Sequence, residues 1–176
     1  LEGKNNSART AGEKLAFENV AEENEMKPQL FFEFDDKVAP REHQRKAVEK
    51  FIEDEFKCLF AMATGTGKTL TSLFAANELS CYVQLDSILI IVPLKDLVDQ
   101  WEKDIRKYFR GEIITVRSGV EWKEKISDLS LLRLLTKEKQ NRFVIITTYD
   151  SFSLNDEKLV SVLGENALII ADEAHK

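Results

Sequence analysis

A glycine-rich segment between an apolar run and a helix-like stretch most constrains how this chain folds. The segment reads Met62-Ala-Thr-Gly-Thr-Gly-Lys68-Thr69 and follows the apolar residues 58–61. Glycines in such a loop let backbone N–H groups curl around phosphate oxygens, while a lysine adds charge and a hydroxyl can ligate Mg²⁺. A helix that starts near Lys68 would direct its positive end at the same anion. The pattern therefore predicts a phosphate-binding loop between a strand and a helix.

The loop departs from the usual GxxxxGK[ST] pattern at its first position, where Met62 replaces glycine. Gly65 and Gly67 still serve the tight turn, so we expect phosphate binding to survive this replacement. A Gly/Thr-rich surface turn is the alternative interpretation, and the preceding apolar run disfavours it. The residues expected to surround the phosphates are Thr64, Gly65, Thr66, Gly67, Lys68 and Thr69.

An acidic motif near the end of the chain completes the pattern. Asp172-Glu173-Ala174-His175 directly follows the apolar residues 167–171. A carboxylate pair at the tip of a strand is what a Mg–nucleotide site needs as its second half. An acidic tetrapeptide alone would be read as a solvated helix face. Its place behind a strand and downstream of the loop favours the nucleotide site.

Short apolar runs and helical spacing alternate along the chain. Strands are predicted at 58–62, 87–92, 112–116, 143–147 and 167–171, and helices at 42–56, 68–79, 95–109, 121–137 and near 156–163. The strands are continuous apolar runs, which is typical of a parallel sheet covered by helices on both faces. Ligands of such sheets bind at the carboxyl ends of the strands, where both motifs fall. We therefore expect an α/β fold with a mainly parallel sheet.

Length and composition limit the function classes. The chain has 176 residues, 43% of them hydrophobic, which is enough for one domain with a core. It has no run of about 18 apolar residues and no secretory signal, so we expect a cytoplasmic protein without a membrane span. Cys58 and Cys81 are interpreted as reduced thiols. The net charge of −6 counts mildly against binding to DNA, because non-specific affinity comes from neutralised phosphates.

Two regions are distinguished by composition. Residues 1–29 are polar and are interpreted as an arm or linker, whereas residues 30–176 carry the alternating pattern. The apolar cluster at 30–34 contains three phenylalanines. Core packing is the favoured interpretation for each, and stacking on an adenine is the alternative.

Four motifs in the order of one family appear between residues 40 and 176. Arg41-Glu42-His43-Gln44 resembles an adenine-reading motif usually written L-R-x-x-Q, with Pro40 in place of the leucine. The segment from 88 to 101 resembles motif Ia, and the segment from 145 to 151 resembles a later DNA-backbone motif. With the loop and the Asp-Glu-Ala-His sequence, the chain resembles the first RecA-like domain of superfamily 2 helicases and translocases, DEAH-type branch. The sequence of the loop at 62–69 most resembles that of the restriction-enzyme and excision-repair members.

The resemblance implies an ATP-hydrolysing site with Mg²⁺. Lys68 would stabilise developing charge on the γ-phosphoryl group, and Glu173 would activate the attacking water. Thr69 and Asp172 would hold the Mg²⁺. Gln44 would read the adenine edge through its amide, Arg41 would support that pocket, and His175 would link the site to a partner domain.

The resemblance also implies nucleic-acid contacts. Small polar side chains and strand-end amides can hold phosphates without reading bases. The candidates are Pro93, Leu94, Gln100, Thr148 and Ser151. Packing or loop roles are the alternative for each of them. Trp101, beside them in the sequence, is expected in the core.

The same resemblance implies further family motifs and a further domain that the 176 residues do not contain. Motif III, whose strand enters the sheet beside the Asp-Glu strand, and a second RecA-like domain with an arginine finger come later in the family. We therefore expect residues 30–176 to be the N-terminal part of the first RecA-like domain, incomplete at its C-terminal side and weak or inactive alone. A fused or partner nuclease is a further expectation.

Several functions remain open at this point. A DNA helicase or translocase motor in restriction, phage defence or repair is the first hypothesis. An RNA-directed motor of the same superfamily is the second. A nucleotide-binding switch or scaffold is the third, and the intact Glu173 argues against it. A small-molecule kinase shares the phosphate loop but is disfavoured by the Asp-Glu-Ala-His motif.

Overall fold

The computed structural model describes residues 29–63, 65–117, 121–135 and 142–174. Its centre is a four-stranded sheet in which all pairs of neighbouring described strands are parallel, with the order β2-β3-β1-β4. The strands are β1 (Ser87–Val92), β2 (Glu112–Thr115), β3 (Phe143–Thr148) and β4 (Ala167–Ala171). Ile90 of β1 is in register with Ile146 of β3 and Ile170 of β4. The predicted parallel α/β sheet is confirmed.

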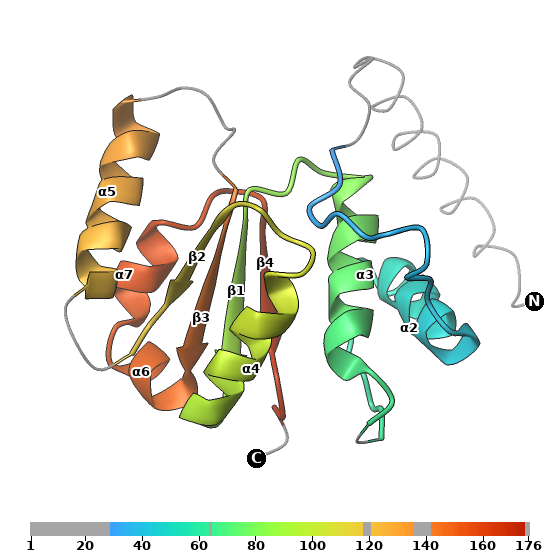
Figure 1. The fold of residues 1–176 in the computed structure, drawn as a ribbon. Helices are drawn as coiled ribbons and strands as arrows, with labels where there is room; N and C mark the ends of the chain where they lie inside the picture. Colours follow the sequence, from blue (N-terminus) through green and yellow to red (C-terminus); the bar gives the residue numbers. More distant parts are fainter. Residues whose placement is uncertain (1–28, 64, 118–120, 136–141, 175–176) are drawn as a thin grey trace, which may run out of the picture.

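Helices cover both faces of this sheet (Figure 1). One face carries α2 (Glu42–Glu53), α3 (Lys68–Ser80) and α4 (Lys95–Ile105). The other carries α5 (Glu121–Leu135), the short α6 (Tyr149–Ser153) and α7 (Asp156–Ser161). Connections between parallel strands need such crossovers, so the helices alternate with the strands along the chain.

The core consists of two hydrophobic clusters separated by the sheet. Every residue of β1 is buried, and its alternate side chains divide between the faces. Ile88 and Ile90 join the cluster beneath α3 and α4, whereas Leu89 joins the cluster beneath α5 and α7. A strand buried on both faces reads as one apolar run, which is why β1 could be placed from sequence.

Aromatic residues close the first cluster near the start of the domain. Phe31 stacks on Phe109 with 5.1 Å between ring centroids, and Phe32 is fully buried. The Asn77 side chain accepts from the Phe32 N–H at 2.6 Å and donates to the Phe32 carbonyl at 2.8 Å. The segment forms no strand, yet these bonds satisfy its buried backbone. The phenylalanines at 31 and 32 are core residues, as favoured above.

The predicted strand at 58–62 is wrong. These residues are irregular, with short-range bonds from the Ala61 N–H to Leu59 O and from the Met62 N–H to Phe60 O. Leu59 is 78% exposed. A strand needs a neighbour for its ladder, and no described strand pairs with this segment, so its apolar run alone does not impose extended pairing.

Helix ends also differ from the expectations. The helix predicted to reach residue 56 ends at Glu53, because Glu55 and Phe56 adopt left-handed backbone angles, φ 55° and 63°. The helix predicted to reach 109 ends at Ile105. Helix α6 was not predicted.

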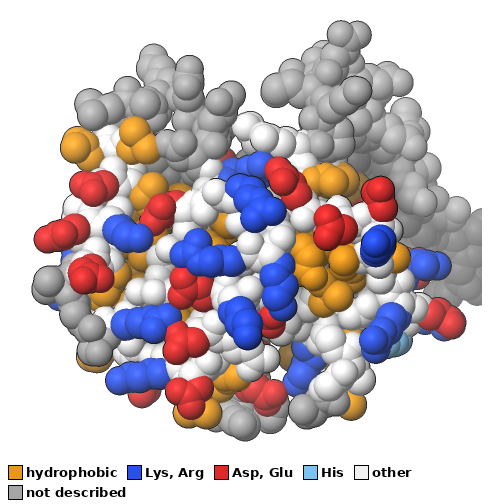
Figure 2. Space-filling view, in the orientation of Figure 1, with side chains coloured by type: hydrophobic (Ala, Val, Ile, Leu, Met, Phe, Trp, Pro, Cys, Tyr) orange, Lys and Arg blue, Asp and Glu red, His pale blue; other side chains and the backbone are white. Residues whose placement is uncertain are grey.

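The surface that faces the viewer is mixed in charge. Figure 2 shows Lys and Arg side chains across its central part, interspersed with Asp and Glu. Within the described parts of the chain, no helix has the length and apolar character to cross a membrane. Cys58 and Cys81 are both exposed free cysteines.

Candidate nucleotide-binding site

The glycine-rich loop ends in a left-handed turn that starts α3. Gly65 and Gly67 have φ values of 79° and 88°, which L-residues rarely adopt. Gly67 is the N-cap of α3 and supplies no capping side chain. The Thr66 hydroxyl donates to Ala63 O at 2.6 Å, which tightens the turn. The first N–H groups of α3 are therefore left for an anion, as expected of a phosphate loop.

Gln44 lies directly beneath this loop. Its Nε2 donates to Gly67 O at 3.2 Å, and its Oε1 accepts from the Arg41 N–H at 2.9 Å. The side chain is only 2% exposed. A β-carbon on Gly67 would lie 2.8 Å from Gln44 Nε2, so a side chain at this position would displace the Gln44 amide. Both ends of the Gln44 amide thus contact the chain itself, and one of them holds the loop.

His43 is a loop contact to which the sequence pattern assigned no role. Its Nε2 lies 3.1 Å from Thr66 O. A groove of 380 Å³ runs beside these residues, between α2 and the irregular segment at 58–63. The start of α2 therefore contacts the glycine-rich loop through two neighbouring side chains, His43 and Gln44.

The two predicted catalytic residues meet across the site. Lys68 Nζ lies 3.0 Å from Glu173 Oε1, although 105 positions separate them in the sequence. Their side chains are 30% and 24% exposed. Glu173 has a left-handed φ of 53°, a strained conformation for a residue with a β-carbon. The fold thus brings the phosphate loop and the acidic motif together, as predicted.

Asp172 is fixed at the end of β4. Its N–H donates to Ile91 O at 2.8 Å, which continues the ladder with β1. The Trp101 indole Nε1 donates to Asp172 Oδ2 at 3.0 Å, and the Tyr149 hydroxyl donates to Asp172 O at 3.0 Å. Burial, and then the nearby Asp172 carboxylate, raises the pKa of Tyr149 above its usual 10.0. The phenol therefore stays protonated at neutral pH and can donate.

The residues present fit a Mg²⁺ ion. The expected ligands are the Thr69 hydroxyl and the Asp172 carboxylate, both hard oxygen donors of the kind Mg²⁺ prefers. The Trp101 contact uses Oδ2 of Asp172 and leaves Oδ1 for the ion or its water. Among the described residues no cluster of three or more His, Cys, Asp and Glu side chains could hold a metal by itself. This agrees with a Mg²⁺ that is shared with nucleotide phosphates.

The nucleic-acid candidates lie at the carboxyl edge of the sheet. Pro93 and Leu94 connect β1 to α4, and Leu94 is 62% exposed. Gln100 is exposed on α4. Thr148 caps α6, because its Oγ1 accepts from the Ser151 N–H at 3.2 Å and donates to Ser151 Oγ at 3.0 Å. Both hydroxyls thus have a structural role in this cap.

Two predicted site residues, Thr64 and His175, lie outside the described residues. The described members of the set gather on one edge of the sheet, at the loop and at the ends of β1, β3 and β4. Trp101 and Tyr149 were missing from it. Trp101 is 3% exposed, as its helical spacing predicted, but its indole N–H needs a partner when buried, and that partner is Asp172.

A phosphate loop before a helix, a parallel sheet and an Asp-Glu pair at a strand end define a RecA-like nucleotide-binding domain. The chain belongs to the family described as Type III restriction enzyme, res subunit, which matches residues 37–176. This confirms the resemblance to superfamily 2 helicases that the motifs indicated.

Three comparisons support the family and the fold. The chain is 28% identical over 144 residues to a type I restriction enzyme endonuclease subunit, SsaAORF53P, of Staphylococcus saprophyticus, covering 79% of this chain and 15% of that protein. It is 26% identical over 161 residues to the DNA 3'-5' translocase XPB2 of Sulfurisphaera tokodaii, covering 92% and 30%. A solved structure of a nuclease-deletion mutant of the Type ISP restriction-modification enzyme LlaGI, in complex with a DNA substrate mimic, superposes with a TM-score of 0.62 at 22% identity. That superposition covers 78% of this chain and 15% of the other.

Proposed function

We propose that this chain is the ATP-binding part of a motor that couples ATP hydrolysis to movement on DNA, in restriction, phage defence or repair. The observation that carries the proposal is the 3.0 Å contact between Lys68 Nζ and Glu173 Oε1. This contact supports the assignment of Lys68 as the phosphate-binding lysine and of Glu173 as the water-activating carboxylate of one site. The restriction-enzyme subunit and the translocase among its relatives support DNA as the track.

The chain's own residues divide the work of hydrolysis. The loop amides and Lys68 would hold the β- and γ-phosphates and balance their charge. Glu173 would orient the attacking water and accept its proton. Thr69 and Asp172 would hold Mg²⁺, which would help to neutralise the charge of the phosphates. Lys68 must leave Glu173 to reach the phosphates, so nucleotide binding and release of the carboxylate are coupled.

The proposal extends to how the domain is organised. We infer that residues 30–176 form the N-terminal part of a first RecA-like domain, preceded by a polar arm at 1–29. The outer edge of β4 supports this inference: among the described strands only β1 pairs with β4, and Ile169 is 56% exposed. A further strand and a second RecA-like domain would complete the sheet and the site. Because an arginine finger is worth about 10³–10⁵ in rate, residues 1–176 alone should hydrolyse ATP feebly.

Partners follow from the same reasoning. The small polar side chains of Thr148 and Ser151 at the end of β3 suit a nucleic-acid backbone, which supports DNA duplex or single strand as the ligand. RNA remains the second candidate track. A nuclease, fused or associated, is proposed because a relative is an endonuclease subunit.

The decisive experiment measures ATP hydrolysis by the full-length natural protein without nucleic acid, with single-stranded DNA, with duplex DNA and with RNA. Lys68→Ala and Glu173→Gln are compared with Lys57→Ala and Glu165→Gln, which change exposed residues outside the site. We expect DNA to stimulate turnover and both site variants to abolish the stimulation. Stimulation by RNA alone would indicate the RNA motor. Nucleotide binding without stimulated turnover, unaffected by Glu173→Gln, would instead support a switch module.

A further inference from the structure

Asp172 is contacted by two side chains from segments that are themselves candidates for nucleic-acid contact. Trp101 lies on α4 directly after Gln100, and Tyr149 lies at the start of α6 directly after Thr148. The indole N–H reaches Oδ2 and the phenol reaches the main-chain oxygen, each at 3.0 Å. The expected metal-binding residue is therefore held at both its carboxylate and its backbone.

Trp101 has little freedom to move independently of α4. It is 3% exposed and packs with Val98 and Ile105 in the core beneath the helix. A buried indole N–H needs a hydrogen-bond partner, and its bond to Asp172 restricts the orientation of the ring. A displacement of α4 therefore changes where the indole N–H points.

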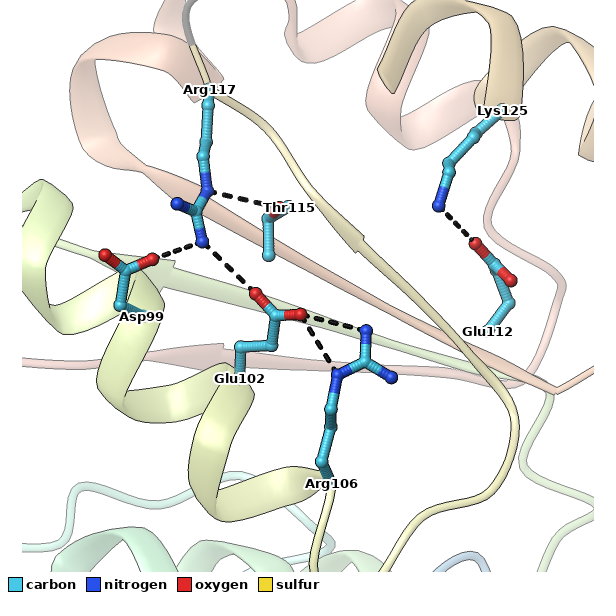
Figure 3. A network of polar contacts seen from close by, with 7 residues as sticks. All are labelled: Asp99, Glu102, Arg106, Glu112, Thr115, Arg117 and Lys125. Carbon is cyan, nitrogen blue, oxygen red and sulfur yellow. Dashed lines mark hydrogen bonds and ion pairs between the residues drawn. The ribbon is translucent and has the colours of Figure 1, made fainter. Parts of the chain in front are cut away.

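The outer side of α4 is tied to the end of β2. Arg117 forms ion pairs with Asp99 and with Glu102, the latter at 3.2 Å, and Glu102 also pairs with Arg106 at 2.9 Å (Figure 3). The helix thus packs on the core with its inner face, and exposed ion pairs contact its outer face. A ligand that binds at Leu94 or Gln100 would therefore shift α4 as a rigid unit, together with Trp101.

Tyr149 is fixed in a similar way by the cap of α6. The Thr148–Ser151 hydroxyl contact closes the first turn, and Tyr149 is the first residue of that turn. A ligand that competes for either hydroxyl would disturb the turn from which the phenol donates to Asp172. The two helices thus contact the same residue, Asp172, one at its carboxylate and the other at its main-chain oxygen.

We propose that Trp101 and Tyr149 are positioning residues for Asp172, and that they link the segments at 93–100 and 148–151 to the metal-binding carboxylate. The proposal rests on the function proposed above. It adds the residues that would connect the nucleic-acid segments to the Mg–nucleotide site. Groups that orient a metal ligand commonly change metal affinity 10–100-fold when removed. Linkage is reciprocal, so nucleic acid that shifts either helix changes Mg–nucleotide affinity by the same factor that Mg–nucleotide changes nucleic-acid affinity.

The test uses the full-length natural protein and measures binding, not turnover. Kd for a non-hydrolysable ATP analogue is determined with Mg²⁺ and with EDTA, each with and without DNA. Trp101→Phe keeps an aromatic ring and loses the N–H, and Tyr149→Phe loses only the hydroxyl. Trp122→Phe and Tyr108→Phe are the matched controls, because these side chains pack in the core away from Asp172. Asp172→Ala defines the loss of the metal-dependent part.

We expect Trp101→Phe and Tyr149→Phe to weaken binding with Mg²⁺ by about 10-fold, to leave binding in EDTA unchanged, and to reduce the effect of DNA on Kd. An equal loss with Mg²⁺ and with EDTA, or no loss in either, would overturn the proposal. If Trp101→Phe lowers the melting temperature, Tyr149→Phe decides alone. If Asp172→Ala itself leaves the metal dependence intact, the assignment of the metal site fails, which is a different result from failure of the positioning role.

Discussion

Lys68 and Glu173 form an ion pair across the site that both residues are expected to serve, with 3.0 Å between Nζ and Oε1. The pair is partly buried, so each charge stabilises the other where solvent screening is reduced. A nucleotide phosphate would compete with the carboxylate for the lysine. Nucleotide binding would therefore exchange one partner of Lys68, the Glu173 carboxylate, for another, the phosphate.

This exchange predicts that Glu173→Gln strengthens nucleotide binding while it removes turnover. The neutral amide would compete less well for Lys68, so Kd for ATP should fall severalfold. Loss of the general base should lower kcat by about 10²–10⁴. Equilibrium binding and single-turnover hydrolysis by the full-length protein would check both parts. Weaker binding by this variant would contradict the exchange.

The two loop glycines should respond differently to substitution. Both have positive φ, so Gly65→Ala and Gly67→Ala should each cost about 1–3 kcal/mol in the loop conformation. Gly67→Ala adds a clash with Gln44 Nε2, whereas a β-carbon on Gly65 meets nothing within 4 Å. We expect the larger loss of nucleotide affinity for Gly67→Ala. Equal losses in a calorimetric titration would show that the approach of Gln44 is unimportant.

Gln44 offers a test of loop support against base reading. Gln44→Ala removes the side-chain partner of the exposed Arg41 N–H and one of the donors to Gly67 O, which keeps the Thr71 N–H and hydroxyl, so we expect a cost of about 0.5–1.5 kcal/mol. If the residue mainly holds the loop, affinities for ATP and GTP should fall by the same factor. A selective loss for ATP would support adenine reading. Gln84→Ala, a change at an exposed glutamine, is the control.

The ion pairs of Arg117 should contribute little to stability. The Arg117 side chain is 49% exposed and that of Asp99 is 60% exposed, so solvent screens the interaction. We expect Arg117→Ala to cost about 0.2–1 kcal/mol, with a smaller effect in high salt. Ile90→Ala, at a fully buried position in β1, should cost about 2–5 kcal/mol at any salt concentration. Thermal melting in low and high salt would measure both.

Tyr149 gives a pH dependence with a defined sign. Its folded-state pKa is raised above 10.0, so the fold favours the protonated phenol. The stabilisation is complete below pH 10 and is lost as pH rises through the folded-state pKa. Tyr149→Phe should remove this alkaline loss of stability, which melting curves between pH 8 and 11 would reveal. A variant with an unchanged alkaline slope would contradict the assignment.

The strands were predictable from sequence where an apolar run has a neighbouring strand to pair with in the fold. β1 and β4 begin and end at the predicted residues, because each is a continuous apolar run of strand length. The segment at 58–62 has the same pattern but no partner among the described strands. Its state depends on a neighbour, which a local pattern does not contain. Helix α6 had a signal that was not used, since Thr148 with Ser151 three residues later is typical of a helix N-terminus.

The candidate site was predictable in its residue types but not in its contacts. The loop and the Asp-Glu pair could be found because their chemistry requires fixed spacing. The contacts of Trp101 and Tyr149 with Asp172 arise from three crossovers that bring distant segments together. The apolar stripe that contains Trp101 indicates that its buried indole N–H needs a hydrogen-bond acceptor, but it does not identify that acceptor.

The one-sided pairing of β4 has a consequence for amide hydrogen exchange. The Asp172 N–H points to β1, so by the alternation of a strand the amides of Leu168 and Ile170 point the same way. Those of Ile169 and Ala171 face the outer edge. Exchange along β4 should therefore alternate between slow and fast from residue to residue. If another strand covers that edge in the full-length protein, the alternation disappears and every amide of β4 exchanges slowly.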